Sequence, residues 1–154
     1  MAMNTATQAV MFGKSSDEWE TPQTFYDTLD KEFHFAIDVA ATAANTKCAG
    51  YFGRNGLEED AMTADWSRAL WAVEDGTRRS VFFMNPPYSR CREFMAKAAL
   101  ETHNGHTIVC LVPARVDTRW FHAHVYDQST RHWYPGVEVR FVQGRLKFGC
   151  TGKP

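Results

Sequence analysis

An apolar run that ends in two prolines constrains the fold of this chain most. Residues 80–84 read SVFFM and pass directly into Asn85-Pro86-Pro87-Tyr88. A short apolar run predicts a buried strand, and the prolines must end it because they lack the N–H that a strand ladder needs. The runs TIVCLVP (107–113) and FHFAIDVA (33–40) predict two further buried strands.

Helices are predicted between these strands. In TPQTFYDTLDKEF (21–33), apolar residues recur at a spacing of four, with Thr21 suited to the N-cap and Pro22 to the first helical position. The other expected elements are helices over 62–73, 90–103 and 117–126 (the last capped by Asp117), a loop over 41–60 with a short strand near Tyr51, and a strand over the alternating segment 137–144.

Strands that alternate with helices predict an α/β fold with a mainly parallel sheet and flanking helices. In such sheets, ligands bind beyond the carboxyl ends of the strands. Two of these ends carry candidate side chains, namely Asp38 to Ala41 and Asn85 to Tyr88. The length of 154 residues predicts one domain, in which the polar residues 1–16 form a mobile arm.

Composition and cysteine usage narrow the class of protein. The chain is 44% hydrophobic and 23% charged, which is typical of a globular protein and not of a disordered one. Because the sequence contains neither a membrane-length apolar run nor a signal peptide pattern, we expect a cytoplasmic protein that does not enter membranes. The four cysteines form no C-x-x-C pair, and His103-x-x-His106 has no completing ligand set, so no metal is expected.

Charge is distributed unevenly along the chain. Residues 1–77 hold 5 Lys/Arg and 13 Asp/Glu, a net charge of −8, whereas residues 78–154 hold 12 and 5, a net charge of +7. Most of the basic residues in the second half are arginines, whose guanidinium groups pair well with phosphate. The asymmetry has two interpretations. The charges can be distributed by chance over solvent-exposed faces, or one end of the molecule binds a polyanion such as nucleic acid.

The Asn85-Pro86-Pro87-Tyr88 segment carries the strongest chemical signal. The prolines stiffen the loop, so that the Asn85 side-chain oxygen and a proline carbonyl can accept hydrogens from one amino group. Tyr88 can then stack on a planar ring. This arrangement polarises the lone pair of an exocyclic or amide nitrogen outward. The alternative is a proline-stiffened turn with a capping asparagine.

The chain resembles the phage-type Dam family of DNA adenine N6-methyltransferases. The resemblance rests on segments that span nearly the whole chain in order: DEWETPQ (17–23), FAIDVAATAANTKCAGYF (35–52), Asp65-Trp66, MNPPYS (84–89), LVPARVDTRWFH (111–122) and GRLKF (144–148). It implies a Rossmann-like class I methyltransferase fold, a single domain over 1–154 without a separate target-recognition domain, and S-adenosylmethionine as methyl donor. The implied substrate is adenine in double-stranded DNA, extruded from the stack.

The resemblance also implies roles for individual residues. The catalytic residues are Asn85, Pro86, Pro87 and Tyr88, and the cofactor-binding residues are Trp19, Thr21, Asp38, Ala40, Asp65 and Asn85. For Thr21, Asp38 and Asp65 a cap, a turn or a surface position is the alternative. Glu58, Glu59 and Asp60 fit either a solvated loop or a ribose contact. The expected DNA contacts are Arg115, Arg119, Arg145 and Lys147, together with Phe148, which either clamps the extruded base or packs as an ordinary strand residue.

Several alternatives remain open at this point. The chemistry of N-P-P-Y also suits cytosine N4, an RNA base or a protein glutamine. Ala40, Ala41 and Ala43 stand where the family pattern expects a glycine-rich loop, which keeps open a DNA-binding protein without catalysis. We expect a monomer or weak dimer in the cytoplasm of a bacterium or a phage-infected host cell, with specificity carried by loops 113–120 and 127–136.

Overall fold

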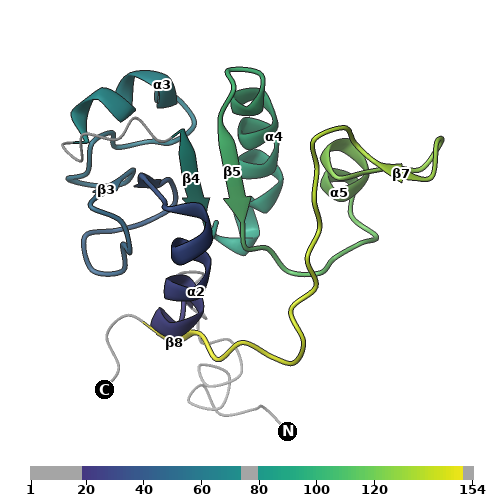
Figure 1. Cartoon of the computed structure of the whole chain (residues 1–154), viewed down its shortest axis with the longest axis horizontal. Helices are drawn as coiled ribbons and strands as arrows, with labels where there is room; N and C mark the ends of the chain where they lie inside the picture. The colour runs from purple at the N-terminus through teal and green to yellow at the C-terminus, as the bar shows by residue number, and fades with distance from the viewer. Residues whose placement is uncertain (1–18, 74–79, 151–154) are drawn as a thin grey trace, which may run out of the picture.

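The structure is a computed structural model that describes residues 19–73 and 80–150. Within these residues the centre is a parallel sheet of four strands in the order β3-β2-β4-β5 (Figure 1). Its strands are β2 (Ile37–Asp38), β3 (Gly50–Tyr51), β4 (Val81–Met84) and β5 (Thr107–Cys110). The predicted parallel sheet and the short strand near Tyr51 are therefore confirmed.

Helices cover both faces of the sheet. Phe83 of β4 faces α2 (Gln23–Phe33), with its ring 5.2 Å from the rings of Tyr26 and Phe35. Its neighbour Phe82 faces the other side, where the Trp66 ring of α3 (Trp66–Ala69) lies 5.1 Å away. The short helix η1 (Leu70–Ala72) continues α3, and α4 (Cys91–Thr102) packs on the same face. A strand that is buried on both faces explains why SVFFM is a continuous apolar run.

The strand order creates a topological switch point. From β2 the chain crosses to β3 on one side, whereas β4 pairs with β2 on the other side and leads on to β5. A reversal of this kind leaves a crevice outside the carboxyl ends of the two central strands. Asp38 ends β2 and Asn85 directly follows β4, so the fold brings both predicted strand-end side chains to this crevice.

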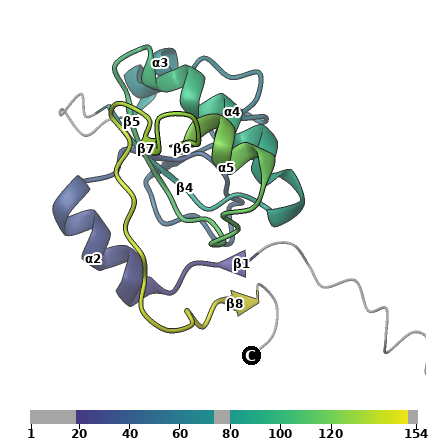
Figure 2. The ribbon, with the colours of Figure 1, turned by 90° about the vertical axis from the view of Figure 1, so that its right-hand side faces the viewer.

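The C-terminal part of the chain returns to the N-terminal part. After α5 (Arg119–His124), the strands β6 (Tyr126–Asp127) and β7 (His132–Trp133) form a hairpin. The chain then passes α2 and reaches β8 (Gly149–Cys150), which pairs antiparallel with β1 (Trp19–Glu20), as Figure 2 shows. Gly149 and Cys150 are thereby paired with Glu20 and Trp19, which are more than 120 positions away in the sequence.

The starts of two helices differ from the prediction. Helix α2 begins at Gln23 with Pro22 at the N-cap, so the prediction of Thr21 as the cap is wrong; its hydroxyl accepts a hydrogen bond from Asn85 instead. Helix α5 has Thr118 at the N-cap, so the prediction of Asp117 is wrong as well. In both cases the residue next in sequence holds the extended backbone that precedes a helix.

Four expected elements are shorter than predicted. The 62–73 helix begins only at Trp66, because the Asp65 side chain accepts from the Arg68 N–H and caps it there. The expected 33–40 strand is reduced to β2, since α2 extends to Phe33 and His34 adopts a left-handed φ of 54°. The 107–113 strand and the 117–126 helix are shortened in the same way and correspond to β5 and α5.

The predicted strand over 137–144 is wrong. This described segment runs as an irregular chain without a partner ladder, although its residues alternate as in a strand. Arg140 holds it to α2 through a two-pronged contact with Glu32, at 2.8 Å for each nitrogen–oxygen pair, and through the Phe33 ring, 5.4 Å away. Phe141 remains 71% exposed. Alternation alone does not make a strand when no neighbouring backbone is available to pair.

The described residues bear on some of the other predictions made from the sequence and not on others. None of the helices there is long and apolar enough to cross a membrane. Across residues 19–73 and 80–150, no group of three or more His, Cys, Asp or Glu side chains is arranged to hold a metal ion. Cys48, Cys91 and Cys110 are free thiols. The expected mobile arm over residues 1–16 lies outside the described residues.

Candidate functional site

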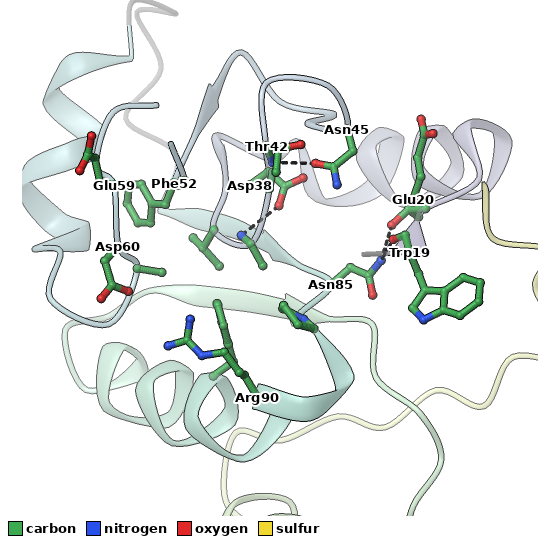
Figure 3. Close-up of a pocket in the computed structure, with 18 residues that line it drawn as sticks. Trp19, Glu20, Asp38, Thr42, Asn45, Phe52, Glu59, Asp60, Asn85 and Arg90 are labelled. Atoms are coloured by element: carbon green, nitrogen blue, oxygen red, sulfur yellow. Dashed lines mark hydrogen bonds between the residues drawn. The ribbon is translucent and has the colours of Figure 1, made fainter. Parts of the chain in front are cut away.

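A cleft opens at the carboxyl ends of β2 and β4 (Figure 3). Its walls come from β1, from the loops that follow β2 and β3, and from the segment between β4 and α4. The cleft therefore collects residues that lie far apart in the sequence. The predicted site residues that line it are Trp19, Thr21, Asp38, Ala40, Asn85 and Pro87.

Asn85 has a fixed orientation in this cleft. Its Nδ2 donates to the Trp19 carbonyl oxygen at 2.8 Å and to the Thr21 hydroxyl oxygen at 3.0 Å. Figure 3 shows the nitrogen of the amide turned toward Trp19 and the oxygen turned away from it. Since a backbone carbonyl only accepts hydrogen bonds, the amide nitrogen must be the atom that faces Trp19. Oδ1 is thereby left as the acceptor that Asn85 presents.

The two prolines after Asn85 occupy different environments. Pro86 is fully buried, whereas Pro87 lines the cleft. The Pro87 carbonyl accepts from the Arg90 N–H at 2.9 Å, which starts the turn into α4. Tyr88 begins the short helix η2 (Tyr88–Arg90) and is half-buried; it is absent from the cleft lining. The predicted turn after β4 is therefore present, and the stiffness of this proline-containing loop stays a prediction.

Asp38 is a buried carboxylate at the floor of the cleft. It is 4% exposed, and its Oδ1 accepts from the Ala40 N–H at 3.2 Å. Burial raises the pKa of Asp38 from 3.8 to about 7, while the Ala40 and Lys47 N–H groups and the Lys47 charge lower it by less. A carboxylate of this kind gains from a cationic ligand, because a positive charge close to it compensates for the lost hydration.

The loop after β2 is made of small residues and lies close to its neighbour. Ala40, Ala41 and Thr42 line the cleft, and Asn45 Oδ1 accepts from the Thr42 N–H at 2.7 Å. Gly53 packs so tightly against this loop that a Cβ there would lie 2.0 Å from the Ala41 carbonyl oxygen. The alanine-rich segment thus forms a compact turn, although it lacks the glycines that the family pattern has.

Strand β1, which pairs with β8, borders the cleft. Glu20 accepts from Lys47 Nζ at 2.7 Å, which ties β1 to the loop after β2. The rings of Trp19 and Phe148 meet edge to face at 6.4 Å between centroids. The structure therefore brings Phe148 next to a residue that lines the cleft, while Arg145 and Lys147 lie on the same segment.

The remaining predicted residues lie elsewhere. Asp65 is absent from the cleft lining and caps α3 through its bond to the Arg68 N–H. Arg115 is exposed after β5, and Arg119 lines a groove between α4 and α5 with Arg92 and His124.

Arg90 and Asn45 both line the cleft, although the sequence analysis did not propose them as site residues. Glu59 and Asp60 also line it, and the sequence analysis had left open whether they lie in a solvated loop or contact a ribose. The position of Arg90 two residues after the N-P-P-Y motif is a signal that could have found it.

Comparison with known proteins identifies relatives of this chain. A family model described as DNA N-6-adenine-methyltransferase (Dam) matches residues 8–153. A curated protein of Escherichia phage T1 with the name DNA N-6-adenine-methyltransferase is 28% identical over 147 residues. The match covers 89% of this chain and 56% of that protein, so the chain spans little more than half the length of this relative. No solved structure matches the chain.

Proposed function

The chain belongs to the Dam family of DNA N-6-adenine-methyltransferases, and on that premise we propose that it methylates the exocyclic amino group of adenine in DNA with S-adenosylmethionine as donor. One observation carries the proposal: the Asn85 amide has its nitrogen held by Trp19 and Thr21, so that its oxygen is the free acceptor in the same cleft as Asp38. A methyltransferase for amino groups needs an acceptor for the amino hydrogens next to a site for a cationic donor.

The fold supports the same proposal. A parallel sheet with helices on both faces and a switch point between β2 and β4 is what a Rossmann-like methyltransferase fold requires at this place. We treat residues 1–154 as one methyltransferase domain in which loops 113–120 and 127–136 supply target specificity.

The residues at the carboxyl end of β2 fit S-adenosylmethionine. The buried Asp38 carboxylate, with its raised pKa, suits the α-ammonium group of the donor. Ala40 and its small neighbours allow close approach, and Glu59 or Asp60 at the other end of the cleft suits ribose hydroxyls. When bound, the donor supplies an electrophilic methyl group on a sulfonium sulfur.

The structure supports the proposed cofactor role of Trp19 better than that of Asp65. Trp19 lines the cleft and keeps its proposed contact with the donor. Asp65 lies outside the cleft lining, so it keeps its proposed role only if it moves from its present position at the start of α3.

The chain's own residues prepare the acceptor nitrogen. An adenine that leaves the DNA stack places its amino group at Asn85 Oδ1, which accepts one of the two hydrogens. A proline carbonyl of the same loop is the proposed acceptor for the other hydrogen; Pro87 lines the cleft, and its carbonyl keeps a second lone pair beside the bond from Arg90. These bonds raise electron density on the nitrogen in a site from which water is excluded, and Tyr88 stacks on the base. One amino proton is released to solvent after transfer.

The basic residues bind the DNA backbone. Arg115 and Arg119 lie beyond the carboxyl end of β5, the strand next to β4, and Arg145 and Lys147 lie on the segment that ends at β8. Guanidinium and ammonium groups at these places fix the register of the duplex through phosphates. Phe148, next to Trp19, is the proposed second aromatic contact for the extruded base.

The experiment that tests this function combines labelled S-adenosylmethionine with unmethylated DNA, followed by mass spectrometry of the nucleosides. We expect labelled N6-methyldeoxyadenosine from the full chain and none from Asn85→Ala. Labelled N4-methyldeoxycytidine would instead identify cytosine as the substrate. Label in RNA or in protein in parallel reactions would identify that molecule as the substrate. DNA binding without cofactor binding in calorimetry, and without product from any substrate, would support the alternative of a DNA-binding relative that lacks catalysis.

A further inference from the structure

The Asn85 amide is held by two acceptors that belong to one short segment, Trp19–Thr21. We propose that this segment is a positioning element: the Trp19 carbonyl fixes which end of the Asn85 amide faces the target amino group, and the Thr21 hydroxyl holds the amide in that orientation. The inference rests on the proposed function, since it assigns a task to the Asn85 oxygen. Its geometric basis is the pair of bonds from Nδ2, at 2.8 Å to the Trp19 carbonyl and at 3.0 Å to the Thr21 hydroxyl.

The orientation of the amide decides whether Asn85 can act. An asparagine side chain presents a donor group and an acceptor group, which interchange when the amide rotates by half a turn. With Nδ2 at the target, a donor would meet the hydrogens of an amino group. With Oδ1 at the target, an acceptor meets them. The Trp19 carbonyl selects the second state because it would repel Oδ1, and the Thr21 hydroxyl takes the second hydrogen of the same NH₂.

The positioning segment is itself held from three sides. Trp19 and Glu20 pair with β8, and Glu20 binds Lys47, whose side chain is only 9% exposed. Thr21 is 4% exposed, and the next residue, Pro22, caps α2 with its carbonyl, which accepts from Phe25 and Tyr26 at 3.1 and 3.0 Å. The two acceptors are therefore in place before any substrate binds, which is the condition for a preorganised site.

This assignment differs from a cofactor contact by Thr21. A hydroxyl accepts and also donates one hydrogen, so Thr21 can hold Asn85 and still offer its own proton to a ligand. The two roles separate in kinetics. A residue that positions Asn85 affects the transfer step, whereas a residue that binds the donor affects the dissociation constant of the donor.

The test compares Thr21→Val, which keeps the shape and removes the acceptor, with Thr21→Ser, which keeps the acceptor. Loss of one hydrogen bond of typical strength predicts a single-turnover rate lower by about 2- to 13-fold in Thr21→Val. We expect the donor Kd to stay within about twofold and Thr21→Ser to retain the wild-type rate. Thr24→Val, at an exposed position of α2, is the matched control and should behave as wild type. If Thr21→Val does not fold, Thr21→Ala removes the same acceptor.

A second readout is independent of activity. The side-chain NH₂ signals of Asn85, assigned by their loss in Asn85→Ala, are measured by ¹⁵N NMR with water exchange. We expect one NH proton of Asn85 to exchange faster in Thr21→Val and both to match wild type in Thr21→Ser. If the wild-type chain transfers no methyl group, the proposed function fails while these signals still test the positioning. Unchanged Asn85 signals in Thr21→Val, or a raised donor Kd with an unchanged transfer rate, would overturn the inference.

Discussion

Replacement of Asp38 by asparagine is predicted to stabilise the protein while it weakens binding of the donor. Asp38 is 4% exposed, and burial raises its pKa from 3.8 to about 7. At 1.36 kcal/mol per pKa unit, this difference corresponds to about 4 kcal/mol of lost folding stability once the carboxyl is ionised in both states. The Asp38→Asn substitution keeps an oxygen for the Ala40 N–H and removes the ionisation.

The pH dependence gives the prediction its sign. The folded state holds the Asp38 proton up to a pH of about 7, whereas the unfolded state releases it near pH 3.8. Relative to Asp38→Asn, the wild-type protein therefore loses stability as the pH rises between these values, because the other titrating groups are common to both proteins. The free energy of unfolding of Asp38→Asn should exceed that of wild type by less than about 1 kcal/mol at pH 4 and by about 4 kcal/mol near pH 8.

Urea denaturation of both proteins without donor, at pH values from 4 to 8, measures this difference. Calorimetry with S-adenosylmethionine should show a strongly raised Kd for the variant. A variant that is less stable than wild type at pH 8, or a difference that does not change with pH, would refute the argument that Asp38 is a desolvated carboxylate kept for a cationic ligand.

The other predictions concern Asn85, the basic residues and the two aromatic residues. Asn85→Ala should abolish methyl transfer in a single-turnover assay while the donor Kd stays within a few-fold; near-normal turnover would remove Asn85 from its role. Arg115→Gln and Arg119→Gln should each weaken DNA binding and reduce the slope of log K against log salt by about one, whereas an affinity independent of salt would point away from a polyanion. Tyr88→Ala should lower kcat/KM by about 5- to 150-fold and Tyr88→Phe should recover most of it, because a stacking contact uses the ring face. Phe148→Ala should resemble Tyr88→Ala if Phe148 contacts the base, and should mainly lower Tm if the Trp19 contact is its only role.

The parts of the fold that depend on local sequence were predictable. The apolar run before Asn85 is β4, and the same run explains why both faces of the sheet are covered. The meeting of Asp38 and Asn85 also followed from the sequence, because the carboxyl ends of parallel strands share one edge of a sheet. The parallel pairing of β4 with β5 agrees with the helix predicted between them, whereas β2 and β3 are parallel although no helix lies between them.

The parts that depend on distant pairing were not predictable. Nothing within residues 137–144 indicates that the segment lacks a partner, and its exposed Phe141 follows from that lack. The pairing of β1 with β8 joins two strands of two residues each, which are too short to give a pattern. The Thr21 hydroxyl was assigned to a helix cap by local rules, whereas its partner Asn85 lies 64 residues away.

The central claim is that the ends of β2 and β4 form one site, with Asp38 for the donor and Asn85 Oδ1 for the acceptor nitrogen. A crystal structure with S-adenosylhomocysteine, the product form of the donor, tests it most directly. We predict that its ammonium group lies at Asp38 and that Asn85 Oδ1, not Nδ2, faces the side of the cleft that holds its sulfur. A ligand bound away from Asp38, or an Asn85 amide whose nitrogen faces that sulfur and no longer bonds to Trp19 and Thr21, would contradict the account.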